Sequence, residues 1–331
     1  MSKFLIQGKD AGSFLNRLCT ANVDDKCNKI TYTQWLNEKG QMEADVTVTK
    51  RNDDSFLVVA TDTMHNHVYM HMKRHLQNEQ HVCITDVTGS YTQINIQGPK
   101  SRQLMESLTS IPMDNASFPF RHAMEIDIGY ARAWCTRITY VGELGYELFI
   151  PVEFSSHIYD QIVDKGLKYN LKHAGLRALG SLRMEKAYRD YGHDMDNTDT
   201  IVDCGLSFTC DFNKELGFMG MDHVLAQKEW IKQHGYFKRL VQVFVSDPDI
   251  LLHHGEVVWR NNERICDIRS ASYGHTLNGA VGLAMLETKD EPITKEYLQN
   301  GYWEIETPEK KVKCELSLSS MYDPKNKRIH V

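Results

Sequence analysis

One short segment combines two glutamates and two tyrosines with a pair of glycines: Tyr140-Val141-Gly142-Glu143-Leu144-Gly145-Tyr146-Glu147-Leu148. A carboxylate at such a position is costly to bury unless it has a polar partner. The segment is therefore either a structural hairpin whose glutamates stay in water, or part of a pocket in which a glutamate accepts hydrogen bonds from paired N–H donors of a ligand. These residues alone favour the hairpin.

A second candidate carboxylate lies in a predicted strand over residues 42–50, where side chains alternate between two faces. The apolar face consists of Met42, Ala44, Val46 and Val48. The polar face consists of Glu43, Asp45, Thr47 and Thr49. A half-exposed antiparallel strand shows the same pattern with its polar face in water. We adopt that interpretation for Glu43, and the pattern by itself assigns no role to Asp45.

Three histidines, His67, His71 and His75, recur every fourth residue in a helix predicted from Asp62 to Gln77. This spacing places them on one helix face, where they could hold a transition metal. No His-Glu-x-x-His motif and no carboxylate at a matching spacing supports a metal. We therefore interpret them as a polar face and predict no metal site. The apolar face of this helix is expected to be Met64, Val68, Met72 and Leu76.

The composition excludes several classes of protein. The chain has 331 residues, a net charge of −6 and 41% hydrophobic residues, which is typical of a soluble globular protein. The sequence contains no stripe of basic and aromatic residues of the kind that binds nucleic acid. It also contains no apolar run long enough to span a membrane, and residues 1–8 carry no targeting signal. The eight cysteines include no Cys-x-x-Cys pair, so we expect no zinc ribbon but reduced, buried thiols such as Cys83.

The hydrophobic periodicity predicts mixed strands and helices up to residue 233. Strands are expected at 3–6, 30–36, 42–50, 56–61, 81–87 and 91–96. Helices are expected after a cap at Asp10 and at 62–77, 100–108, 154–166, 173–188 and 219–234. From residue 238 the pattern changes to short strands, at 240–245, 256–259, 265–270, 281–285 and 302–306, with a turn at Asn261-Asn262. We place a domain boundary near 233–237.

Four segments, in order along the chain, resemble the folate-binding family that contains the glycine-cleavage T-protein and the C-terminal halves of sarcosine and dimethylglycine dehydrogenases. These segments are 36–49, 140–148, 179–195 and 322–328. The last two are most similar to the dehydrogenase branch. The resemblance implies an α+β fold: an aminomethyltransferase-like folate-binding domain with antiparallel sheets and packed helices over 1–233, then a small β-barrel domain over 238–331.

The same resemblance implies roles for individual residues. Asp45 matches the catalytic aspartate beside the reactive nitrogens of tetrahydrofolate, and Glu147 matches the glutamate that accepts hydrogen bonds from the pterin N–H groups. Tyr140, Thr61 and Tyr188 match residues that line the folate pocket; for Tyr188, a core aromatic on its helix is an equal alternative. When a folate nitrogen attacks a one-carbon unit it becomes cationic, and a carboxylate can stabilise that charge and take the proton.

The implied function is a one-carbon transfer module that forms 5,10-methylenetetrahydrofolate from an iminium or formaldehyde. Leu179 occupies the position at which many T-proteins have arginine, and a leucine cannot replace a guanidinium group. This difference weakens the interpretation of the chain as an aminomethyltransferase that acts on a lipoyl carrier. The sequence has no Gly-x-Gly-x-x-Gly turn, so FAD is expected only through a domain not present in this chain, in a flavin dehydrogenase domain or subunit. By family, we expect the mitochondrial matrix.

Three alternatives remain open. The first is a stand-alone aminomethyltransferase. The second is a non-catalytic protein similar to the pyruvate dehydrogenase phosphatase regulatory subunit, and the third is a structural scaffold that binds no folate. The presence of both Asp45 and Glu147 favours the enzyme.

Overall fold

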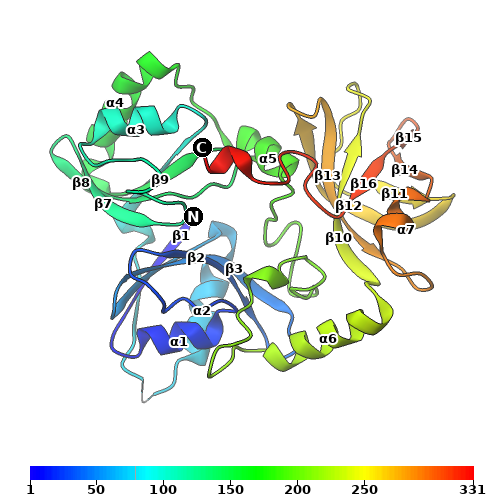
Figure 1. Ribbon diagram of the computed structural model, residues 1–331, viewed down its shortest axis with the longest axis horizontal. Helices are drawn as coiled ribbons and strands as arrows, with labels where there is room; N and C mark the ends of the chain where they lie inside the picture. Colours follow the sequence, from blue (N-terminus) through cyan, green and yellow to red (C-terminus); the bar gives the residue numbers. More distant parts are fainter. Residues whose placement is uncertain (79) are drawn as a thin grey trace.

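The computed structural model describes residues 1–78 and 80–331. Its three β-sheets form three lobes (Figure 1). Helix α5 (Leu176–Glu185) and the C-terminal segment lie between the second sheet and the third (Figure 1). The predicted α+β architecture of antiparallel sheets, packed helices and a C-terminal barrel is confirmed.

The first sheet has five antiparallel strands in the order β2-β3-β4-β1-β5. They are β1 (Ser2–Gln7), β2 (Ile30–Leu36), β3 (Met42–Asn52), β4 (Ser55–Ala60) and β5 (Cys83–Asp86). Helices α1 (Ala11–Leu18) and α2 (His65–His75) pack on it around Phe4 and Trp35. The apolar face predicted for β3 is buried, since none of its four side chains is more than 2% exposed.

The second sheet has the order β6-β9-β8-β7 and packs against two helices, α3 (Ser101–Leu108) and α4 (Ser155–Gly166). Its strands are β6 (Tyr91–Gln97), β7 (Ala123–Ile128), β8 (Ala131–Thr136) and β9 (Gly145–Pro151). The hairpin interpretation of 140–148 holds for the backbone, because residues 137–144 connect the adjacent antiparallel strands β8 and β9. Its expectation that Glu147 stays in water is wrong, because β9 lies between β6 and β8 and burial affects this carboxyl group.

Helix α5 is shorter at both ends than the predicted 173–188. Ala187 has φ 53°, a left-handed conformation that ends the helical path two residues after Glu185. Tyr188 therefore lies beyond the helix, and the alternative of a core aromatic on that helix is wrong. The chain then runs through a long irregular connection to α6 (Met221–His234). In α6, Val224 is buried, whereas the adjacent Leu225 is 41% exposed.

The third sheet has seven strands in the order β15-β14-β11-β12-β13-β10-β16 and forms a nearly closed barrel. Its strands are β10 (Lys238–Val245), β11 (Val257–Arg260), β12 (Glu263–Gly274), β13 (Gly279–Glu287), β14 (Trp303–Glu306), β15 (Lys311–Lys313) and β16 (Glu315–Ser317). The short helix α7 (Lys295–Gln299) packs on the barrel core. Asn261 and Asn262, with φ of 50° and 68°, make the predicted turn between β11 and β12.

Short 3-10 segments complete the fold: η1 (Asp62–Met64), η2 (Thr88–Ser90), η3 (Val152–Phe154), η4 (Leu167–Tyr169), η5 (Ser207–Thr209) and η6 (Lys327–Ile329). Two sequence predictions fail locally. The Asp10 carboxylate does not cap α1 but accepts a hydrogen bond from the backbone of His81 at 2.8 Å. Cys27 and Cys83 are exposed. Within residues 1–78 and 80–331, no helix is both long and apolar enough to cross a membrane.

Candidate functional site

Asp45 lies on β3 opposite Gln34 of β2. Gln34 Nε2 donates to Asp45 Oδ1 at 2.7 Å, and the Tyr32 hydroxyl donates to Oδ2 at 3.1 Å. Burial raises the pKa of Asp45 to about 7, against the lowering effect of these two hydrogen bonds and of the Arg189 charge. The carboxyl group therefore changes charge near neutral pH, where a proton acceptor works best.

Glu147 lies on β9, paired with Asn95 of β6 and Thr136 of β8. Its Oε2 accepts a hydrogen bond from Gln93 Nε2 at 3.0 Å. Burial raises the pKa of this carboxyl to about 7 as well. Among the described residues, neither Glu147 nor Asp45 has a cationic side chain within 4.0 Å, so both carboxylates are held without the ion pair that usually accompanies burial.

Tyr140 connects the irregular segment before β9 to the region around Asp45. Its hydroxyl donates to the Arg189 carbonyl at 2.8 Å, and its ring stacks on Tyr188 with centroids 6.1 Å apart. Burial raises the pKa of Tyr140, and the charges of Asp190 and Asp45 add to the shift. The structure therefore brings Asp45, Tyr140 and Tyr188 together.

The other two predicted residues, Thr61 and Glu147, have polar partners outside this group. Thr61 follows β4, and its carbonyl accepts a hydrogen bond from the Ser2 hydroxyl at 3.4 Å. In the part of the chain that the structure describes, no hydrogen bond or ion pair joins Thr61 or Glu147 to Asp45 or Tyr140.

Several polar neighbours of the two carboxylates were not anticipated. Tyr32 and Gln34 hold Asp45 directly, Gln93 holds Glu147, and Arg189 adds charge near Asp45. The pairing of Gln34 with Asp45 could not be read from the sequence. A regular hairpin with its turn at residues 37–40 would place Glu43 opposite Gln34, and a register shift between Trp35 and Leu36 moves the pairing to Asp45. The Gln93 contact depends on a long-range strand pairing that no local pattern gives.

The histidine face of α2 differs from its prediction. His71 is buried and does not belong to an exposed polar face. Its ring stacks on Trp35, with the ring centroids 5.6 Å apart. Burial lowers the pKa of His71 to about 3, so the ring is neutral. His67 Nε2 lies 3.0 Å from Glu43 Oε2, which shows that Glu43 is paired rather than simply in water. No group of three His, Cys, Asp or Glu residues, within the described ranges, is arranged to hold a metal ion.

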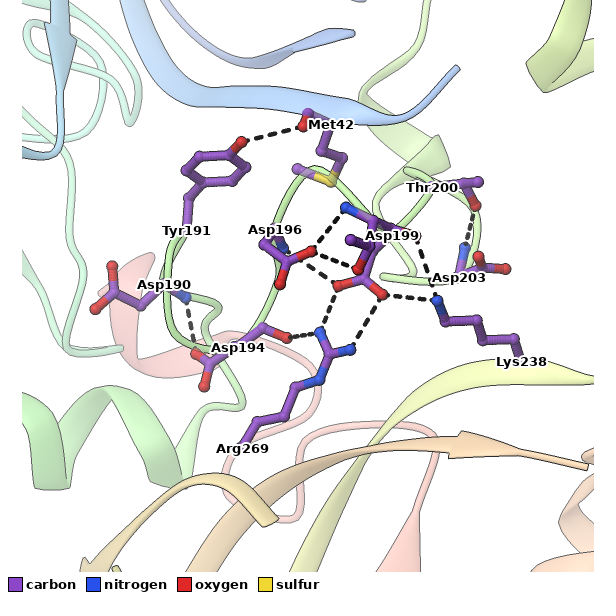
Figure 2. Close-up of polar contacts among 11 residues, drawn as sticks. Met42, Asp190, Tyr191, Asp194, Asp196, Asp199, Thr200, Asp203, Lys238 and Arg269 are labelled. Carbon is purple, nitrogen blue, oxygen red and sulfur yellow. Dashed lines mark hydrogen bonds and ion pairs between the residues drawn. The ribbon is translucent and has the colours of Figure 1, made fainter. Parts of the chain in front are cut away.

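An ion network joins the barrel to the start of β3 (Figure 2). The fully buried Asp199 carboxylate binds both terminal nitrogens of Arg269 and, at 2.9 Å, Lys238 Nζ. The Asp199 carbonyl accepts a hydrogen bond from Met42 N at 3.0 Å, and the Tyr191 hydroxyl donates to the Met42 carbonyl at 3.1 Å. Two barrel cations thus hold residues 191–199 against the strand that carries Asp45.

Replacing Asp199 with asparagine is expected to lower the free energy of unfolding by about 3 kcal/mol at pH 7, because a buried anion is lost and its two partly buried cationic partners are left without it. The hydrogen bonds from Arg269 and Lys238 outweigh burial and lower the pKa of Asp199. Its stabilising contribution is therefore present above the unfolded-state pKa and is lost as the pH falls through the folded-state pKa. Urea unfolding at pH 7 and pH 3 measures both effects.

The matched control is Asp267→Asn, which removes an exposed partner of Arg264 in the same barrel. That change should cost less than about 1 kcal/mol. Equal losses for the two variants would show that the Asp199 network contributes no more than a surface pair.

Comparison with known proteins gives the family. Residues 1–214 match the GCVT N-terminal domain, and residues 238–323 match the glycine cleavage T-protein C-terminal barrel domain. The chain belongs to the GCVT aminomethyltransferase family. The crystal structure of glycine cleavage system aminomethyltransferase T from Bartonella henselae has the same fold, with a TM-score of 0.80 at 18% identity over 97% of this chain and 83% of that one.

Among curated relatives, the chain is 32% identical to 4-methylaminobutanoate oxidase (formaldehyde-forming) of Paenarthrobacter nicotinovorans, over 99% of its length. It is 29% identical to the mitochondrial pyruvate dehydrogenase phosphatase regulatory subunit of Mus musculus over 90% of its length. It is 26% identical to the mitochondrial sarcosine dehydrogenase of Mus musculus over 99%. The chain spans 38%, 35% and 37% of these three proteins, respectively.

Proposed function

We propose that the chain is a tetrahydrofolate-binding module that transfers a one-carbon unit to form 5,10-methylenetetrahydrofolate. The observation that carries this proposal is the pair Asp45 and Glu147, two carboxyl groups that have no ionic partner among the described residues and whose pKa values burial raises to about 7. Perturbed carboxyls of this kind are typical of sites that bind or act on a ligand. The family membership supplies the ligand class.

Glu147 is the proposed anchor for the pterin ring. A carboxylate accepts two parallel N–H donors, and the reduced pterin presents adjacent donors on its ring. The hydrogen bond from Gln93 fixes one oxygen and orients the group within β9. A ligand with two N–H donors would replace the hydrogen bonds to water that this carboxyl group loses when it is buried.

Asp45 is the proposed proton acceptor. The folate nitrogen forms a C–N bond to the one-carbon unit with its lone pair, becomes cationic, and passes its proton to the Asp45 carboxylate. Tyr32 and Gln34 hold the carboxylate in one orientation. Tyr140, Tyr188 and Thr61 are proposed to line the folate pocket, with Tyr140 and Tyr188 offering a stacked pair of rings.

The one-carbon unit is proposed to come from an iminium or formaldehyde produced by a flavin site in another domain or subunit. Two relatives are named as an oxidase that forms formaldehyde and as a dehydrogenase. The printed sequence has no Gly-x-Gly-x-x-Gly turn for FAD, so no step here is assigned to a flavin. The domain boundary near 233–237 and a mitochondrial location also remain proposals.

A regulatory function is the second candidate, because one relative is named as a phosphatase regulatory subunit. Folate affinity does not separate the two functions, since a regulatory protein can retain the pocket. Turnover separates them, because only the enzyme accelerates the chemical step.

Titration calorimetry with tetrahydrofolate tests the proposed function. We expect saturable binding to the folded protein at micromolar to millimolar ligand. The absence of heat at millimolar tetrahydrofolate, from protein shown to be folded by circular dichroism, would refute the folate site.

A further inference from the structure

Two arginines converge on Gly205, a glycine in the connection between α5 and α6. Gly205 has φ +70°, and a methyl group built on it would lie 2.9 Å from Arg239 Nη2 and 3.1 Å from Arg189 Nη2. Two guanidinium groups therefore flank one point on the backbone. Like charges this close repel each other unless an anion or water lies between them.

Backbone carbonyls accept hydrogen bonds from both guanidinium groups. Arg189 donates from Nε to the Cys204 carbonyl at 3.1 Å and from Nη1 to the Ala187 carbonyl at 3.0 Å. Arg239 donates from Nη1 to the Val202 carbonyl at 2.5 Å, and its guanidinium lies 4.7 Å from the centre of the Tyr236 ring. These contacts fix the orientation of both side chains before any ligand arrives.

Nη2 of each guanidinium group, and also Nε of Arg239, has no acceptor among the described residues. No carboxylate of residues 1–78 or 80–331 lies within 4.0 Å of either arginine. Neither Nη2 is among the buried polar atoms that lack a partner, so both reach solvent. Burial lowers the pKa of Arg239, and the nearby charge of Arg189 adds to that effect.

The arginine pair is next to the candidate active site. The Arg189 charge lowers the pKa of Asp45, and the Arg189 carbonyl accepts the hydrogen bond of Tyr140. Arg239 begins the barrel and Arg189 follows α5, so the pair also lies where two parts of the fold meet.

We infer that Arg189 and Arg239 form a binding site for a ligand carboxylate. Two convergent, pre-oriented N–H donors match the two oxygens of a carboxylate, and the shared positive charge makes the contact charge-assisted. This inference rests on the proposed function, which gives the carboxylate two sources. One is the glutamate end of the reduced folate, and the other is the carboxylate of an N-methyl amino acid that supplies the one-carbon unit.

The test compares Arg239→Gln with wild type by anaerobic titration calorimetry, using three probes. Tetrahydrofolate carries the glutamate, 6-methyltetrahydropterin has the same reduced ring without it, and N-methylglycine is the donor-like carboxylate. Loss of one charge-assisted contact should weaken binding about tenfold or more. Arg264→Gln, which removes an exposed arginine from the same barrel, is the matched control and should change none of the affinities.

If the site takes the glutamate, Arg239→Gln binds tetrahydrofolate about tenfold or more weakly and 6-methyltetrahydropterin unchanged. If it takes the donor, tetrahydrofolate is unchanged and N-methylglycine binds more weakly. Equal weakening of tetrahydrofolate and 6-methyltetrahydropterin, no change with any probe, or no binding of any probe by wild type would overturn the inference.

Failure of the proposed function gives a different result. Wild type would then bind N-methylglycine in an Arg239-dependent way and bind no tetrahydrofolate. Circular dichroism checks that each variant is folded. Should Arg239→Gln unfold, Arg239→Lys keeps the charge but not the fork of donors, and it should show the same selective loss.

Discussion

Replacing Glu147 with glutamine is expected to weaken tetrahydrofolate binding by about tenfold to a hundredfold, because a charge-assisted pair of hydrogen bonds becomes a neutral contact with one donor facing another. The side chain keeps its size, and Gln93 can still contact the amide oxygen. The loss should therefore appear in the dissociation constant measured by calorimetry and not in the folded fraction measured by circular dichroism.

The pH dependence of binding gives a second readout for Glu147. Its pKa of about 7 means that half of the carboxyl groups in the free protein are neutral at that pH. Wild-type affinity should therefore rise between pH 6 and pH 8 as the carboxylate forms, whereas Glu147→Gln should not share this rise. Glu125→Gln, an exposed change on β7 of the same sheet, is the control. Unchanged affinity in Glu147→Gln would remove Glu147 from the site.

Asp45→Asn is expected to slow the protein-dependent condensation of formaldehyde with tetrahydrofolate by about a hundredfold, because asparagine cannot take the proton. The measurement is the rate of methylenetetrahydrofolate formation above the uncatalysed background. Glu43→Gln, on the same strand face, should retain the wild-type rate. Asp45→Asn should weaken folate binding less than Glu147→Gln does; the reverse order would exchange the two proposed roles.

The stability of Asp45→Asn separates lost chemistry from lost structure. Because the folded-state pKa of Asp45 is raised to about 7, the folded protein binds the proton more tightly than the unfolded chain does. Between the unfolded-state pKa and about 7, wild type therefore loses stability as the pH rises, and asparagine avoids this loss. The variant should melt no lower than wild type at pH 8. Equal condensation rates for the two proteins would favour the regulatory function over the enzymatic one.

Local patterns predicted much of the scaffold. The alternation in 42–50 gave the buried and polar faces of β3, and the asparagine pair gave a barrel turn, because side-chain period and turn conformation are set by neighbouring residues. The hairpin of β7 and β8 was missed although its signal is present, with alternating residues on either side of Gly129.

Other features depend on contacts between distant parts of the chain. Arg269 binds Asp199 across 70 positions, and Gln93 reaches Glu147 across 54. Helix propensity does not predict the left-handed conformation of Ala187, which removes Tyr188 from its helix, because alanine is the strongest helix former. The raised pKa values of Asp45 and Glu147 come from burial, which the sequence shows only as a polar residue on a strand.

The most direct test of the account is a crystal structure of this chain with bound tetrahydrofolate. We predict the pterin N–H groups on the Glu147 carboxylate and the reactive nitrogens beside Asp45, with the Tyr140 and Tyr188 rings against the ligand. Tetrahydrofolate bound elsewhere, for example in the cavity of about 430 Å³ lined by Arg177, Leu252 and Tyr273, with no contact to either carboxylate, would contradict it.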